Sequence, residues 1–116
     1  MIQITAHHRL LLAVDPADFR KGIDSLAALC QHHFSCDPFN GTVFVFTNRR
    51  RISVKLLAYD GNGFWLCQKR FSSGKLKWWP KTQEQALNLR ASELLVLLAQ
   101  GVPTETHIPD NWREII

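Results

Sequence analysis

The sequence predicts one α+β domain, in which a small antiparallel β-meander packs against two helices. Residues 42–79 contain short runs rich in β-forming residues, separated by turn signals. Residues 18–33 and 91–100 instead repeat apolar side chains at helical spacing. A chain of 116 residues can bury one core, and no Pro/Gly-rich linker divides it. We therefore expect residues 1–103 to form a single domain, followed by an irregular tail at 104–116.

The N-terminal part predicts a strand followed by a helix. Residues 9–14 are apolar, and Asp15-Pro16 ends this run with a turn. From Asp18 the apolar residues recur three or four positions apart, which predicts a helix running to about residue 33. Asp15 or Asp18 suits its N-terminus, where a carboxylate satisfies free backbone amides. Residues 36–41, Cys-Asp-Pro-Phe-Asn-Gly, then predict a turn.

The middle of the chain predicts antiparallel strands joined by tight turns. Strands are expected at 42–47, 52–59, 64–71 and 75–79, with a further short strand at 86–89. Residues 60–63, Asp-Gly-Asn-Gly, are typical of a hairpin turn, because Gly and Asn accept a positive φ. The second helix is expected at 91–100, with Leu94, Leu97 and Leu98 on its inner side and Gly101 at its end.

The composition favours a cytoplasmic protein. No apolar run approaches the ~20 residues of a membrane span, and the first residues make a poor signal peptide. The three cysteines, Cys30, Cys36 and Cys67, are an odd number, which argues against a disulfide framework. We therefore expect reduced thiols.

Positive charge is concentrated in the middle third of the chain. The whole chain carries +4, whereas residues 49–90 carry ten Lys and Arg against two acids, a net charge of +8. Such segregation is typical of a surface that binds a polyanion. Three consecutive arginines, Arg49, Arg50 and Arg51, stand at the turn expected between the strands 42–47 and 52–59.

No pattern of catalytic or metal-binding residues stands out. Cys30, His32, His33 and Cys36 lie close together, but their spacing is not that of a usual zinc site. Cys30 is better explained as a small apolar residue on the helix seam with Leu26. Nucleophile, phosphate-loop and zinc-protease motifs are absent, and the acids are not paired as metal-dependent phosphoryl transfer requires. We expect no enzyme, no catalytic residue, no metal and no cofactor.

Aromatic residues beside the cations favour nucleic acid, because bases stack on rings while phosphates bind Arg and Lys. Trp78 and Trp79 follow the cations of the 75–79 strand, and alternation should bury one indole and leave the other partly exposed. Each residue alone has an ordinary alternative, since tryptophans fill cores and lysines cover solvated faces. The candidate DNA-binding residues are Arg20, Lys21, Arg49, Arg50, Arg51, Lys55, Lys69, Arg70, Lys75, Lys77 and Trp78.

Several blocks of the sequence together resemble one known family. They are Asp18-Phe19-Arg20-Lys21-Gly22, Asp37-Pro38-Phe39-Asn40-Gly41, Val43-Phe44-Val45-Phe46 with Asn48-Arg49-Arg50-Arg51, Lys55-Leu56-Leu57, Asp60-Gly61-Asn62-Gly63-Phe64, Lys69-Arg70 and Trp79-Pro80. In this order and spacing, over about residues 9–101, the chain resembles the TnpB accessory proteins of the insertion-sequence-66 family. These are products of the element's second open reading frame, encoded beside the large transposase. An unrelated RNA-guided nuclease shares their name.

The resemblance implies a bacterial transposable element, a role that supports transposition, and a DNA context with the transposase as partner. It assigns no catalytic residue. The sequence departs from the family at Arg90, where Ser or Thr usually caps the second helix, and in its longer tail. Our first hypothesis is a non-enzymatic accessory protein that binds DNA through the basic meander without strong sequence preference. The alternative is an adaptor whose acidic ends and apolar tail dock the transposase without contacting DNA, and a nuclease is a third.

Overall fold

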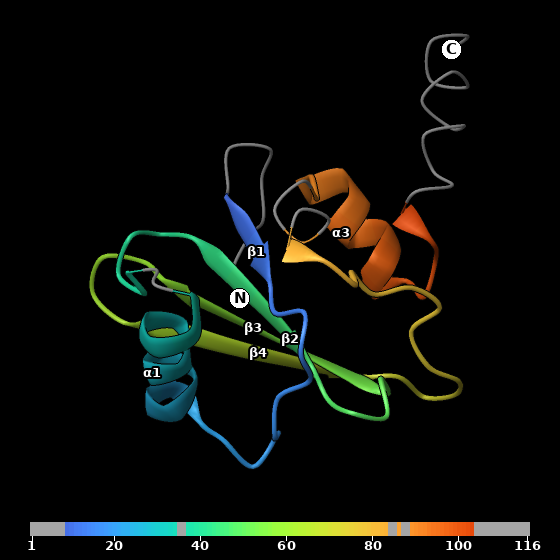
Figure 1. Ribbon diagram of the computed structural model, residues 1–116, viewed down its shortest axis with the longest axis horizontal. Helices are drawn as coiled ribbons and strands as arrows, with labels where there is room; N and C mark the ends of the chain where they lie inside the picture. The colour runs from blue at the N-terminus through green and yellow to red at the C-terminus, as the bar shows by residue number, and fades with distance from the viewer. Residues whose placement is uncertain (1–8, 35–36, 84–85, 87–88, 104–116) are drawn as a thin grey trace, which may run out of the picture.

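The computed structural model describes residues 9–34, 37–83, 86 and 89–103, and it confirms the α+β class (Figure 1). The predicted tail at 104–116 lies outside these ranges. Within them, every helix is too short or too polar to cross a membrane. In chain order the elements are β1 (Leu10–Leu12), α1 (Ile23–Phe34), β2 (Val43–Thr47), β3 (Ser53–Tyr59), β4 (Phe64–Arg70) and α3 (Ala91–Leu98).

The strands form one sheet in the order β1-β2-β3-β4. β2, β3 and β4 make the antiparallel meander that the sequence predicts, with Phe44 opposite Leu57 and Leu57 opposite Leu66. β1 joins the sheet in parallel, with Leu11 opposite Phe44, so the sheet is mixed. The parallel pairing follows from the helix between β1 and β2, because a strand–helix–strand crossover returns the chain in its original direction.

Both faces of the sheet are covered over β1, β2 and β3, and Figure 1 shows the two helices on either side of the strands. On one face Val54 and Leu56 pack with Leu94 and Leu97 of α3. The residues on the other face pack with α1; this cluster contains Phe44, Phe46, Leu57, Leu26 and Cys30. The predicted packing of Cys30 beside Leu26 is confirmed, as is the inward orientation of Leu94 and Leu97. Because neighbours on a strand alternate between faces, β2 is buried at every position.

The first helix begins later than predicted, at Ile23 rather than near Asp18. The Asp18 carboxylate accepts a hydrogen bond from the backbone N–H of Arg20 at 3.0 Å, and Lys21 N–H donates to the Asp18 carbonyl at 3.0 Å. These local bonds form a turn in place of helix. The helical hydrogen bond from Leu26 N–H to the Gly22 carbonyl then marks the start of α1.

Two predicted strands are wrong. Residues 75–79 run without a strand partner, held by Leu76 N–H donating to the Arg51 carbonyl at 2.8 Å and by the Trp79 indole donating to the Ala13 carbonyl at 2.8 Å. In the predicted strand 86–89, Ala86 is helical, with its N–H donating to the Thr82 carbonyl, and Leu89 is in no strand. Residues 87–88 lie outside the described ranges.

The predicted hairpin turn at 60–63 is confirmed, whereas the second helix ends at Leu98, two residues before the predicted end. Asp60 N–H donates to the Gly63 carbonyl at 3.0 Å, and Gly61 takes a φ of 101° that glycine accepts without strain. After α3, Gly101 N–H donates to the Val96 carbonyl at 2.9 Å. The left-handed residue at this helix end is Gln100, with a φ of 64°, rather than the glycine.

Candidate nucleic-acid interface

The three arginines occupy the turn between β2 and β3. Arg51 N–H donates to the Asn48 carbonyl at 3.0 Å, and the Asn48 side chain accepts Ile52 N–H at 3.0 Å. Arg49 and Arg50 are exposed and Arg51 is half-buried, which confirms that at least two of the three reach solvent. Among the described carboxylates, none lies in ion-pair contact with them. The turn therefore presents adjacent guanidinium groups that no carboxylate of the described residues neutralises.

Arg51 has a strained backbone. Its φ of 59° lies in the left-handed region, where glycine is favoured and a side chain costs about 1–3 kcal/mol. Glycine would satisfy the turn equally well. An arginine at this position therefore keeps a cation on the turn at the expense of stability, which points to a role for the side chain beyond folding.

A hollow on one side of the turn is lined by cations. Arg51, Lys75 and Lys77 border an open space of about 750 Å³. Leu76 is buried between the two exposed lysines, although this segment is not the strand that the sequence predicts. The Gln100 side chain holds the adjacent loop, because its Nε2 donates to the carbonyls of Ser73 at 2.9 Å and Lys75 at 3.3 Å.

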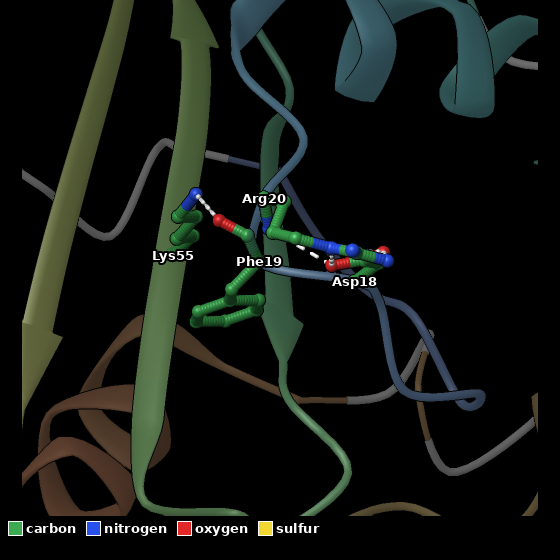
Figure 2. Close-up of polar contacts among 4 residues, drawn as sticks. All are labelled: Asp18, Phe19, Arg20 and Lys55. Atoms are coloured by element: carbon green, nitrogen blue, oxygen red, sulfur yellow. Dashed lines mark hydrogen bonds and ion pairs between the residues drawn. The ribbon is translucent and has the colours of Figure 1, made fainter.

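A second hollow, of about 720 Å³, lies on the other side of the turn and is less basic. Arg49 and Arg50 line it together with Arg20 and Asp18. Arg20 Nη2 lies 2.6 Å from Asp18 Oδ2, and Figure 2 shows the two side chains lying against each other. Hydrogen bonds from the Arg20 side chain, then from its backbone N–H, lower the pKa of Asp18 to about 2, and the same contact raises the pKa of Arg20. Asp18 therefore compensates one of the cations in this hollow.

Lys55 does not belong to the surface where we placed it. It lies on the face of β3 opposite Val54, as alternation predicts, but that face is covered, and Lys55 is only 6% exposed. Its Nζ donates to the Phe19 carbonyl at 2.8 Å, as Figure 2 shows, and it also donates to the Lys21 carbonyl at 3.0 Å. The ammonium also lies 4.9 Å from the centroid of the Phe19 ring. Lys55 thus fastens the turn before α1 to the sheet and is left out of the candidate interface.

The remaining candidates separate into two groups. Arg70 is exposed at the end of β4, opposite Ser53, and so lies beside the arginine turn. Lys69 Nζ instead donates to the Leu98 carbonyl at 2.7 Å, at the C-terminus of α3, where a cation offsets the helix dipole. Trp78 is half-buried against the α3-side core while Trp79 is buried, which confirms the division predicted for the two indoles. Lys21 is exposed beside Arg20.

Sequence reasoning missed three residues that shape the site. An Asn before a turn is a usual signal, so the role of Asn48 could have been anticipated. Asp18 was assigned to helix capping, although its spacing from Arg20 also suits an ion pair. No sequence signal indicates that Gln100 reaches the loop at Ser73, because that contact depends on tertiary packing.

The structure gathers six cations at one end of the sheet. We call this surface the basic end; it comprises Arg49, Arg50, Arg51, Arg70, Lys75 and Lys77. Guanidinium and ammonium groups in this arrangement can donate charge-assisted hydrogen bonds to several phosphates. Within the described residues, no group of His, Cys, Asp and Glu could hold a metal ion. Cys36 lies outside the described residues, as does the side chain of His33.

One protein family and two individual proteins are similar to this chain. The family described as "IS66 Orf2 like protein" matches residues 8–107. The uncharacterized protein y4jC of Sinorhizobium fredii is 34% identical over 91 residues, which cover 78% of this chain and 77% of that protein. The uncharacterized protein y4hO of the same organism is 31% identical over 105 residues, covering 90% of this chain and 89% of that one. No solved structure gives a significant match.

Proposed function

The chain belongs to the family of IS66 Orf2 like proteins, and from this premise we propose that it binds DNA through its basic end. Family membership makes it an accessory protein of insertion-sequence transposition. We propose that it acts without catalysing a reaction. The observation that carries the DNA-binding proposal is the turn of three arginines, in which Arg51 keeps a cation in a strained conformation.

The proposed contacts are with phosphates rather than bases. The large aromatic side chains near the basic end are withdrawn, since Trp79 is buried and Trp78 is half-buried against the core. Phosphate contacts position a protein on DNA without reading its sequence. We therefore propose binding with weak sequence preference, strong dependence on salt, and a contribution from each cation of the basic end.

A fluorescence anisotropy titration tests this proposal. DNA from the element's ends and random DNA of the same length would be titrated with the full chain at several salt concentrations. We expect similar affinities for both, and a slope of log affinity against log salt no steeper than about −5.4, since each of six neutralised phosphates contributes about −0.9. Absence of binding to either DNA at low salt would contradict the proposal.

The alternative function is an adaptor that docks the transposase of the same element. It is favoured by exposed apolar side chains that are not part of the basic end, namely Phe39 at 55% exposure and Leu95 at 57%. Purified transposase and the chain would be mixed without DNA in a pull-down. If the transposase is retained while no DNA titration shows binding, the adaptor replaces our first proposal.

A further inference from the structure

β4 is an edge strand, and one side of it has no backbone partner among the described residues. Phe71 N–H donates to the Ile52 carbonyl and Asp60 N–H to the Gly63 carbonyl, so these two hydrogen-bonded pairs bracket the β3–β4 ladder. Such pairs alternate along an antiparallel ladder. Trp65, Cys67 and Lys69 therefore bond to β3. The even-numbered residues of β4, which are Phe64, Leu66, Gln68 and Arg70, direct their N–H and C=O groups outward.

This edge lacks most of the devices that keep sheet edges from pairing. It contains no proline, its seven residues pair with β3 without interruption, and its first half is apolar. Trp65 is 41% exposed there. Cations stand only in the second half, at Lys69 and Arg70. A partner strand must therefore bring apolar surface to the first half and avoid like charge at the second.

We propose that the occupant of this edge is β4 of a second copy of the chain, paired antiparallel about a two-fold axis at Cys67. Seven residues with Cys67 at their centre then pair completely. Phe64 lies opposite Arg70 of the second copy, and Trp65 opposite Lys69 of the second copy. Aromatic residues thus stand opposite basic residues across the interface, with no cation opposite another. The contact is isologous, as a two-fold dimer requires.

Other registers serve the edge less well. Because the outward groups belong to even-numbered residues, each residue's partner can change only by two positions. A change of this size moves the two-fold axis by one residue. Centring the axis on Gln68 places Arg70 opposite Leu66 and leaves Phe64 opposite Ser72. Centring it on Leu66 places Lys69 opposite Gly63 and Phe64 opposite Gln68. The register at Cys67 is the one in which both cations face rings.

The dimer would join two copies of the sheet edge to edge. Since β4 runs antiparallel to its partner and the basic end adjoins the end of β4, the two basic ends would lie at opposite ends of the paired strands. If DNA binds as proposed above, one dimer could hold two separate DNA segments. The pairing itself does not depend on DNA, and the experiments below contain none.

Sedimentation equilibrium of the full chain under reducing conditions tests the interface. We expect a species of twice the 13.3 kDa chain mass. Gln68→Pro removes an outward N–H that β3 does not use, so it should weaken the dimer about tenfold or more while circular dichroism stays unchanged. Gln68→Ala keeps the N–H and should dimerise like wild type. A wild-type monomer at every concentration, or a dimer unaffected by Gln68→Pro, would overturn the proposal.

A charge pair provides a second test if Gln68→Pro fails to fold. Trp65→Lys places a cation opposite Lys69 of the second copy, whereas Trp65→Glu places an acid there. Both variants lose the same hydrogen bond from the Trp65 indole to Asp60. We expect Trp65→Lys to be monomeric and Trp65→Glu to dimerise. Equal behaviour of the two variants would count against this register.

Disulfide formation tests the register directly. The experiment uses a Cys36→Ser variant, which leaves two cysteines in the chain. Of these, Cys67 is half-buried and Cys30 is buried. Opposed Cys67 residues form a non-hydrogen-bonded pair with Cα atoms about 4.5 Å apart, within disulfide range. Mild oxidation should therefore link two chains, and Cys67→Ser should abolish the link. In that double-serine background, Trp65→Cys should link to Lys69→Cys in a mixture and not to itself. A Trp65→Cys homodimer would refute the axis at Cys67.

Discussion

Arg51 shows at the residue scale how this chain gives up stability for charge. Its left-handed backbone would suit glycine, yet the position carries a guanidinium beside Lys75 and Lys77. The neighbouring cations differ in a way that sequence cannot show. Lys55 is buried and donates hydrogen bonds to two backbone carbonyls, and the charge of Arg20 is neutralised by Asp18. Cations that count equally in the net charge therefore differ in whether they are available to bind a phosphate.

Replacing Arg51 should separate stability from binding. Arg51→Gly relieves strain of about 1–3 kcal/mol and adds about 0.5–1 kcal/mol of chain entropy to the unfolded state, so the protein should become modestly more stable. DNA affinity should fall at the same time. Arg51→Ala retains the strained backbone and should weaken binding equally without the gain. Urea unfolding with DNA titration measures both, and tighter binding by Arg51→Gly would contradict the role of the side chain.

Asp18 should restrain DNA binding through Arg20. Asp18→Asn frees the guanidinium in the hollow beside Arg49 and Arg50, so affinity should rise and the salt slope should steepen by up to about 0.9. Asp37→Asn makes the same change of charge at the other end of β2 and should alter the slope less. Weaker binding by Asp18→Asn would show that the pair serves the interface in another way.

The same pair makes stability depend on pH. The folded pKa of Asp18 is about 2, below the usual 3.8, so the unfolded chain holds this proton more tightly. The stabilisation is present above about pH 4 and is lost as the pH falls through about 2. The thermal unfolding temperature of wild type should therefore approach that of the Asp18→Asn variant as the pH is lowered through this window. A difference in unfolding temperature between the two proteins that stays constant with pH would contradict the stabilisation by the Asp18–Arg20 pair.

At the scale of elements, local patterns were sufficient where neighbours in sequence decide the structure. The hairpin at 60–63, the strands β2 to β4 and the apolar side of α3 follow from turn residues and periodicity. The parallel pairing of β1, the missing strand at 75–79 and the late start of α1 depend on partners distant in sequence or on one side chain. The burial of β3 on both faces also depends on partners distant in sequence. For this reason alternation alone wrongly predicts that Lys55 lies on the DNA-binding surface.

Lys55 joins two elements, and its removal should affect folding rather than DNA binding. Lys55→Met keeps the length of the side chain but leaves the Phe19 and Lys21 carbonyls without their donor, which should cost about 1–3 kcal/mol. The salt slope should stay unchanged. Lys77→Met is the matched control, because it should leave stability within about 0.5 kcal/mol and flatten the slope by about 0.9. A shallower slope for Lys55→Met in a folded protein would return Lys55 to the interface.

At the scale of the whole molecule, charge and fold are arranged along the sheet. The basic end gathers cations from the β2–β3 turn, the end of β4 and the segment 75–77. The hairpin turn and the aromatic contacts of Phe39, Tyr59 and Phe64 lie at the opposite end. The sequence shows that the middle third is basic, but which cations share one surface follows from the order of the strands.

The sharpest test of DNA binding by the basic end is the salt dependence of DNA affinity in the Arg49→Ala, Arg50→Ala, Arg51→Ala variant. We expect this variant to bind specific and random DNA more weakly alike, with a slope flatter by about two to three units. Folding should survive, since Arg49 and Arg50 are exposed and such substitutions cost under about 0.5 kcal/mol each, while Arg51→Ala keeps the backbone strain that is already present. The triple Arg→Lys variant keeps the charge and should retain the slope. Unchanged affinity and slope in the folded alanine variant would contradict DNA binding through these arginines and leave them as a solvated turn.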